Sequence, residues 1–273
     1  MNRSRSRYLI YIPLVLVTIF YLIPLYVMLV TGFKSFDEIS LQTMWSLPKS
    51  GLHFDNFIEA LSKLAPYFKN SIIMVVPAAI ISSILGSLNG YILSKWKFPG
   101  ADLIFPAILF GMFIPYQSIL IPLVQFMKSI NLYGGVGGLI LAHVIYGIPI
   151  TTLTFRNYYA TIPKELLEAA RIDGADIMGI YFKVMLPISL PSFVVVLIWQ
   201  FTSAWNDFLF AVVLTGSQSW PVTVALNNMA GSQIIAWNVQ MAGSFLAALP
   251  TLLIYIFLGN YFLRGLMAGA LKG

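Results

Sequence analysis

The sequence contains no cysteine and few charged residues of either sign. Without cysteine, the chain can form neither a disulfide bond nor a thiolate metal site. Charged residues make up 10% of the 273 positions, whereas about a quarter are charged in a typical soluble domain. Hydrophobic residues make up 59% of the chain. This balance excludes a soluble globular domain and predicts an all-α integral membrane protein.

Long stretches without charge divide the chain into expected membrane spans. A helix needs about 20 apolar residues to cross the hydrocarbon core, and a charge at its centre costs about 2.5–3.5 kcal/mol. The last stretch, Phe208–Leu263, is too long for one helix, and its first half is rich in Ser, Asn and Gln. We therefore expect an external or interfacial loop over residues 212–240. The six expected spans cover residues 8–31, 70–93, 103–126, 138–156, 184–210 and 241–263, each bound being approximate.

Basic residues are unequally distributed between the segments that join these spans. If the N-terminus lies inside the cell, the inner segments hold eleven of the 16 Lys and Arg residues. Since basic residues favour the cytoplasmic side, both termini are predicted to be cytoplasmic. The apolar run near the N-terminus is too long for a cleaved signal peptide, which favours an uncleaved first span. The expected parts are a first span with an outer loop (1–68), a core of five spans (69–263) and a cytoplasmic tail (264–273).

Two ionisable side chains fall within the expected spans. His143 has no second ligand nearby in the sequence, so a hydrogen-bonded core position is expected, although ionisable groups in membranes are functional candidates. Asp207 could cap a helix end, line a water-filled path or reach solvent, and solvent is the expected position. Small residues between Ser82 and Gly90 predict close packing of the second span against a neighbour.

Residues 162–191 form a charged interval between apolar runs. Pro163 and Glu165 suit the first turn of a helix, where no proline N–H is needed and acidic groups face the positive end of the dipole. Gly174 predicts its end, because glycine adopts the left-handed conformation without strain. The result is a surface helix of about eleven residues. Asp176 is expected to cap a second helix, which runs through Ile177–Met185 toward Pro187.

The same interval resembles a known signature. It contains Glu168-Ala169-Ala170, then Gly174, then Val184-Met185-Leu186-Pro187. This spacing resembles the EAA signature of permease subunits of ATP-binding-cassette (ABC) importers, with Val184 where isoleucine is usual. The surrounding residues look like the carbohydrate branch. The C-terminal run Gly265–Gly273 is similar to the tail of the maltose-type second permease, although Met267 replaces a threonine often found there.

The resemblance implies a type-1 ABC importer permease fold with a cytoplasmic coupling helix, in a prokaryotic inner membrane. It implies no enzyme activity and no cofactor in this chain, because ATP and magnesium would bind a partner ATPase. The implied partners are a second permease subunit, two ATP-binding subunits, an extracytoplasmic sugar-binding protein and membrane lipid, with no nucleic acid. The implied coupling residues are Glu168, Ala169, Ala170, Asp173, Gly174, Leu186 and Pro187, and the tail residues facing the ATPase are Gly269, Lys272 and Gly273.

The substrate is addressed by weaker features. Residues 220–226 and 237–238 look like permeases for glucose or mannose, and an oligosaccharide such as maltose or trehalose is the alternative. In the maltose-type system the other permease holds the sugar, so this chain could lack substrate contacts. Amide and indole side chains suit hydroxyl binding and stacking on sugars, but they also serve in helix packing. The candidates on these grounds are Gln117, Gln200, Trp205 and Asn206.

Two other function classes are weaker. An ion-coupled carrier would need intramembrane acids or bases along its path, and the spans offer only His143 and Asp207. A membrane enzyme would need a catalytic set or a phosphate-binding loop. The glycine-rich run at residues 131–138 continues with leucine and isoleucine rather than with Gly-Lys-Ser or Gly-Lys-Thr, so it is expected to be a turn.

Overall fold

The computed structural model describes residues 3–231 and 235–270, with side chains described for 11–231, 235–259 and 261. The described backbone is helical and contains no strand beyond an isolated bridge between Gly134 and Thr215. This confirms the all-α class. The chain forms two compact units, which are treated separately: Met1–Pro66 with Ala225–Leu249, and Tyr67–Val224 with Pro250–Gly273.

The first unit is held together by buried amides. It contains α1 (Arg3–Gly32), the start of α2 (Asp55–Lys95), most of α11 (Val222–Ala230) and the start of α12 (Trp237–Ala270). Asn56 Nδ2 donates to the carbonyls of Gly32 and Lys34, at 2.8 and 2.9 Å. Asn238 Nδ2 donates to Asn56 Oδ1 at 2.9 Å. The end of α1 is thereby tied to the starts of α2 and α12.

Two expectations for this unit are wrong. The second helix begins at Asp55, well before residue 70, so the last part of the expected outer loop is helical and continuous with the span. Its apolar side is covered, since Ala60 and Leu64 have no exposed surface. The expected loop at 212–240 contains α11 and the start of α12. Two of its amide nitrogens form bonds inside the protein: Asn238 Nδ2 donates to Asn56 Oδ1, and Gln240 Nε2 donates to the Leu226 carbonyl at 3.0 Å.

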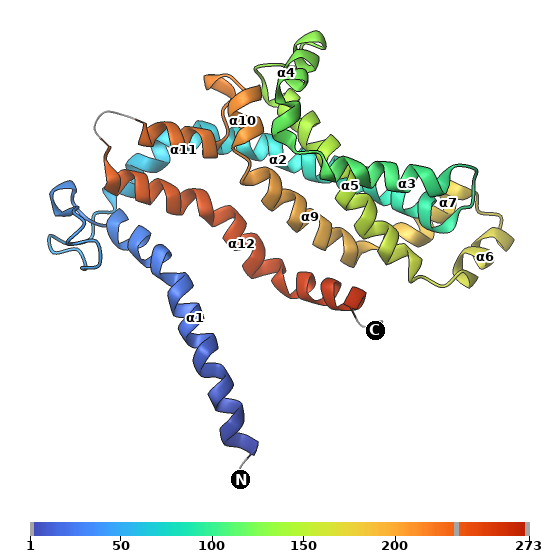
Figure 1. Ribbon diagram of the computed structural model, residues 1–273, viewed down its shortest axis with the longest axis horizontal. Helices are drawn as coiled ribbons and strands as arrows, with labels where there is room; N and C mark the ends of the chain where they lie inside the picture. The colour runs from blue at the N-terminus through green and yellow to red at the C-terminus, as the bar shows by residue number, and fades with distance from the viewer. Residues whose placement is uncertain (1–2, 232–234, 271–273) are drawn as a thin grey trace. The chain divides into compact units, whose positions relative to one another are not determined.

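The second unit contains the rest of the helices. Figure 1 shows α5 (Val136–Ala160) lying beside α3 (Ala101–Phe110) and α9 (Leu190–Trp205). The remaining elements are α4 (Leu120–Ser129), α6 (Glu165–Ile172), α7 (Ile177–Ile180), α8 (Leu186–Ile188) and α10 (Leu209–Leu214).

Glycines allow α2 and α5 to pack closely, as the small residues predict. A Cβ atom on Gly90 would lie 2.6 Å from the Arg156 nitrogen and 2.7 Å from Phe155 Cβ. A Cβ atom on Gly86 would overlap Thr151. Thr151 Oγ1 also donates to the Ser82 carbonyl across the same contact, at 3.0 Å. Close backbone approach through small residues is how membrane helices associate.

Four helices are long and apolar enough to cross a membrane, or up to six spans exist if each of two bent pairs is one span. The expected span 103–126 falls on a pair bent by 91°, Ala101–Phe113 with Tyr116–Ser129. The break lies at Pro115, whose ring cannot continue a helical hydrogen-bond ladder. The other pair, Ile177–Ile188 with Leu190–Trp205, is bent by 76°. The second helix of this pair ends at Trp205, whereas the expected span ends at residue 210.

Candidate functional site

Helix α6 is built from a charged sequence with one apolar anchor. Glu165 and Glu168 lie in its first turn, where carboxylates face the positive end of the helix dipole. Leu167 is 5% exposed and packs in a cluster of buried residues that includes Tyr159 and Ile180. Glu168 and Ala169 point to the exposed face. The helix therefore lies on the rest of the unit through one side and leaves the other side free.

The end of α6 follows the predicted pattern but comes earlier. The helix has eight residues rather than about eleven, because its regular backbone stops at Ile172. Gly174 has a φ of +82°, which confirms the left-handed turn. The amide of Ala175 donates to the Ala170 carbonyl at 3.0 Å, which satisfies one of the last carbonyls. Asp176 Oδ1 accepts the Gly179 amide at 2.8 Å, so the predicted cap is confirmed.

The segment after this cap is less regular than expected. The second helix is a short α7, a π-helical turn over residues 181–185 and then α8. Pro187 lies in α8 and is exposed, while Leu186 is half-buried beside the cluster that holds Leu167. Widened π turns are frequent at functional positions in helices.

A chain of buried hydroxyl groups connects this irregular segment to α2 and α5. Tyr181 donates to Ser87 at 3.0 Å, and Ser87 lies 2.6 Å from the Tyr159 hydroxyl. Tyr159 donates to Ser189 Oγ at 3.0 Å, and Ser189 donates to the Leu186 carbonyl at 2.9 Å. The four side chains have almost no exposed surface. A buried network with every member paired fixes the relative positions of the helices that supply it.

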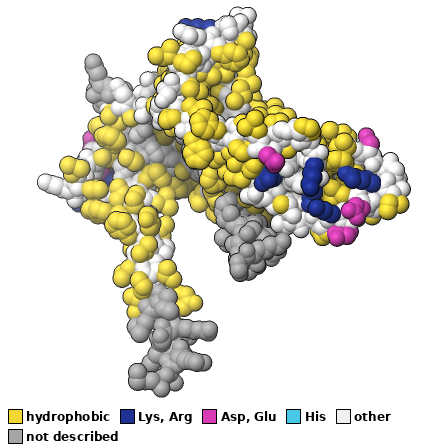
Figure 2. Space-filling view, turned by 45° about the vertical axis from the view of Figure 1, so that its right-hand side comes forward, with side chains coloured by type: hydrophobic (Ala, Val, Ile, Leu, Met, Phe, Trp, Pro, Cys, Tyr) yellow, Lys and Arg dark blue, Asp and Glu magenta, His cyan; other side chains and the backbone are white. Residues whose placement is uncertain are grey.

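The surface around α6 is charged and partly held in place. Figure 2 shows acidic and basic side chains gathered over this end of the unit, beside apolar surface. The Arg171 guanidinium lies over the Trp96 ring, 4.3 Å from its centroid. Lys95 Nζ donates to the Ile162 carbonyl at 2.6 Å. Within the described residues, Glu168 and Asp173 form no ion pair, so both carboxylates remain open to a partner.

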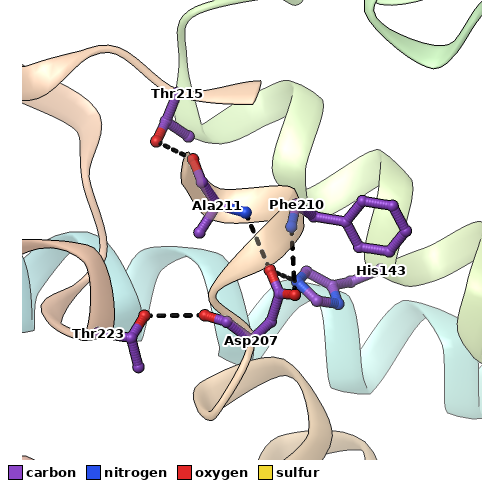
Figure 3. Close-up of polar contacts among 6 residues, drawn as sticks. All are labelled: His143, Asp207, Phe210, Ala211, Thr215 and Thr223. Atoms are coloured by element: carbon purple, nitrogen blue, oxygen red, sulfur yellow. Dashed lines mark hydrogen bonds and ion pairs between the residues drawn. The ribbon is translucent and has the colours of Figure 1, made fainter. Parts of the chain in front are cut away.

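A second feature of the same unit is a cavity of about 550 Å³ between α2, α5, α9 and the start of α10. Asp207 lies in the break between α9 and α10. Its carboxylate accepts the amides of Phe210 and Ala211, at 3.3 and 3.0 Å, and its carbonyl accepts Thr223 Oγ1 at 2.8 Å. Figure 3 shows the same carboxylate facing the His143 ring.

The position expected for Asp207 is therefore wrong. Its side chain is only 12% exposed, and Oδ2 lies 3.4 Å from His143 Nε2. Asp207 instead fulfils one of the alternatives, because it caps the first turn of α10, and its side chain also lines the cavity. His143 is 9% exposed, and the approach of its Nε2 atom to Asp207 does not have hydrogen-bond geometry.

The four candidate substrate residues have different positions. Gln200 and Asn206 line the cavity, and Gln200 Nε2 donates to Ser82 Oγ at 2.8 Å. Trp205 is 1% exposed and stacks on Phe201, with ring centroids 5.4 Å apart, so it is a packing residue. Gln117 is exposed and lies outside the cavity lining. The structure therefore brings two of the four together, beside His143 and Asp207.

The tail candidates lie at the end of the chain. Gly269 is in the last turn of α12, and Lys272 and Gly273 lie outside the described residues. In the described part of the chain, no three His, Asp or Glu side chains are grouped as metal ligands would be.

Comparison with known proteins gives a family match. Residues 83–267 match the model of the family described as binding-protein-dependent transport system inner membrane component. A probable ABC transporter permease protein of Pyrococcus horikoshii is 48% identical, over 99% of this chain and 98% of the relative. A xylose/arabinose import permease protein of Haloferax volcanii is 36% identical, over 92% and 89% of the two chains.

A glucose import system permease protein of Saccharolobus solfataricus is 34% identical, over 94% of this chain and 92% of the relative. Among solved structures, a chain of a bacterial ABC transporter that imports the acidic polysaccharide alginate superposes with a TM-score of 0.80. The superposition covers 96% of this chain and 99% of that chain, at 24% identity, and it shows a shared fold.

Proposed function

Because the chain belongs to the family of binding-protein-dependent transport system inner membrane components, we propose that α6 couples it to a separate ATPase and that it forms half of a sugar translocation path. Membership, together with the sugar permeases among its relatives, makes the chain a permease subunit of a carbohydrate ABC importer. As such it is a multi-pass inner-membrane protein, is not itself an enzyme, and works with ATPase and permease partner subunits.

The observation that carries the coupling role is the attachment of α6. Its buried side is fixed through Leu167, and the following segment is bound to α2 and α5 through Ser87 and Tyr159. Its free side presents Glu168 and Ala169, a carboxylate beside a small residue that permits close approach. A force applied to this side by an ATPase would be transmitted to the spans, because the connecting network is buried and paired.

The remaining coupling residues follow from this arrangement. Asp173 and Gly174 form the turn that ends the docking side, and Leu186 and Pro187 lie where the chain re-enters the membrane. In the proposed complex, two ATP-binding subunits hold ATP and magnesium, and a second permease completes the path. An extracytoplasmic sugar-binding protein delivers the substrate. Both termini face the cytoplasm, as the bias of basic residues favours, and Gly269, Lys272 and Gly273 extend toward the ATPase.

For the substrate we propose a glucose- or mannose-type monosaccharide. Support comes from the relatives named for glucose and for xylose and arabinose. An oligosaccharide of the maltose or trehalose type is the alternative, supported by a relative named as a diacetylchitobiose uptake permease. An ion-coupled carrier has less support. His143 and Asp207 lie together in one cavity, and among the described residues no chain of further ionisable groups leads from this pair across the protein.

The test uses the complex of this chain with its second permease, its ATPase subunits and its binding protein, reconstituted in liposomes. Gly174→Asp changes the left-handed turn that ends the docking side. We expect it to reduce both the recovery of the ATPase with the permease and ATP-driven uptake from a panel of labelled sugars. Gly51→Asp is the matched control, since Gly51 also has positive φ, at +104°, with open space beside it. Equal ATPase recovery and uptake in both variants would contradict the coupling role.

A further inference from the structure

The cavity beside Asp207 has properties that the packing of helices does not require. Its volume of about 550 Å³ lies within the range of about 300–1,000 Å³ that small-molecule sites occupy. Every lining residue belongs to one compact unit. The lining residues therefore keep the relative positions that this unit gives them.

Polar groups in the cavity are left without full pairing. His143 Nε2 is buried and has no hydrogen-bond partner within the described residues. A buried ring nitrogen without a partner costs free energy, which a ligand hydroxyl at that position would recover. Asn206 and Ser203 are exposed to the same space from the end of α9. The cavity thus offers a carboxylate, an imidazole, an amide and a hydroxyl.

Aromatic rings surround these polar groups. Phe210 contacts the rings of Tyr116, Tyr146 and His143, with centroids 5.4, 5.0 and 6.0 Å apart. Trp199, on α9, also lines the cavity, and its side chain is 53% exposed. Flat apolar rings next to a few directed polar groups suit a ligand with apolar C–H faces and polar edges, which is the character of a sugar ring.

The charge of the lining restricts the ligand further. Within the described residues that line the cavity there is no Lys or Arg, so a carboxylate or phosphate on the ligand would meet no cation. The Asp207 carboxylate already accepts two backbone amides and faces His143. Its negative charge is therefore stabilised without a cation on the ligand. Burying an unpaired ligand charge here would be costly. An uncharged polyhydroxyl compound meets no such penalty.

We propose that this cavity is a binding site for an uncharged sugar within this chain, where His143 and Asp207 bind sugar hydroxyls and Asn206 assists them. The proposal rests on the proposed function and adds that this subunit contacts the cargo. Hydroxyls can donate to the Asp207 carboxylate and either donate to or accept from the imidazole. Gln200 holds the wall of the cavity through its bond to Ser82.

The test uses the same reconstituted complex. His143→Phe keeps an aromatic ring against Phe210 and removes both ring nitrogens, and Asn206→Ala removes the amide. We expect each substitution to reduce uptake of the transported sugar about tenfold, because the loss of one hydrogen bond costs about 1.4 kcal/mol. ATP hydrolysis stimulated by the binding protein should be retained. Asn157→Ala is the control, since Asn157 is an exposed amide outside the cavity.

A second measurement separates sugar contact from a structural role. Uptake is compared for glucose, xylose and maltose, for singly deoxygenated analogues of the transported sugar, and for glucuronate. If His143 contacts one sugar hydroxyl, the wild-type complex should import the analogue that lacks this hydroxyl less well than the parent sugar. His143→Phe should import the two equally, whereas a substitution that only destabilised the protein would reduce uptake of both in proportion. Unchanged uptake and discrimination in both cavity variants overturn the site, and efficient glucuronate uptake by the wild type overturns its restriction to uncharged sugars. Failure of the proposed function is distinguishable, because the wild-type complex would then import no sugar at all.

Discussion

The Tyr159 hydroxyl at the end of α5 donates to Ser189 Oγ, at 3.0 Å, where α8 meets α9. This bond joins the last turn of one helix to the bend of the segment that follows α6. Tyr159 also shares a bond of 2.6 Å with Ser87 on α2. A single side chain therefore connects three parts of the unit at the level where α6 is attached.

Tyr159→Phe should destabilise the complex measurably. The substitution keeps the ring and removes two buried hydrogen bonds, those to Ser87 and Ser189, each worth about 0.5–1.5 kcal/mol. Ser87 keeps its bond from Tyr181, and Ser189 keeps its bond to the Leu186 carbonyl. The control is Tyr158→Phe, whose hydroxyl donates to the Ile188 carbonyl in an exposed position where water can replace it. Thermal unfolding of the purified complex should show a larger decrease in Tm for Tyr159→Phe. Equal Tm values would mean that the buried chain contributes nothing beyond an exposed bond.

Gly90→Ala should weaken the contact between α2 and α5. The added methyl group would lie 2.6 Å from the Arg156 nitrogen, and insertion into a close-packed contact costs about 1–3 kcal/mol. Gly259→Ala is the matched change, because Gly259 is also helical and has open space beside it. That control should be neutral or stabilising by about 0.5–1 kcal/mol, since alanine favours helix. Denaturation of the two variants in the same detergent gives the comparison, and similar stabilities would argue against tight packing at Gly90.

Local chemistry made much of the α6 region predictable. Gly174 and Asp176 act through their own backbone conformation and nearest amides, so residue type and spacing were enough to place the turn and the cap. The length of α6 was overestimated, because a helix can begin or end one or two residues away from its signals. Ser87 and Tyr181 gave no comparable signal, since their bond joins residues far apart in the sequence.

The cavity could not be derived from spacing alone. His143 and Asp207 were noticed because ionisable groups are rare in spans, but their approach depends on the break between α9 and α10. The sequence around Asp207 reads as the end of a span near water, which favoured solvent. The early start of α2 was missed for a related reason. Its polar residues suggested a surface loop, whereas Asn56 is buried and bonded to two carbonyls.

The loop after α1 should loosen in acid. The bond from Ser50 to the Glu38 carboxylate, aided by the Lys49 amide, holds the pKa of Glu38 below its usual value of 4.5. A carboxyl with a lowered folded-state pKa contributes stability above its unfolded value, and this contribution is lost as the pH falls through the folded value. The amides of Lys49 and Ser50 should therefore lose protection against hydrogen exchange below pH 4.5, beyond the intrinsic pH dependence.

Glu38→Gln is the reference for that measurement. It removes the titrating group, so its amide protection should follow the intrinsic pH dependence alone over the same range. If the wild-type protein and Glu38→Gln showed the same pH profile at Lys49 and Ser50, the carboxylate would not be what orders this loop.

Two adjacent leucines of α6 should separate folding from docking. Leu167 is 5% exposed within a buried cluster, so Leu167→Ala should cost about 2–5 kcal/mol and lower the Tm of the permease. Leu166 is 44% exposed, so Leu166→Ala should leave the Tm almost unchanged. If the exposed side of α6 contacts the ATPase, Leu166→Ala should still weaken the recovery of the ATPase with the permease. Retained recovery for Leu166→Ala, with normal Tm, would place the ATPase contact elsewhere on the cytoplasmic surface.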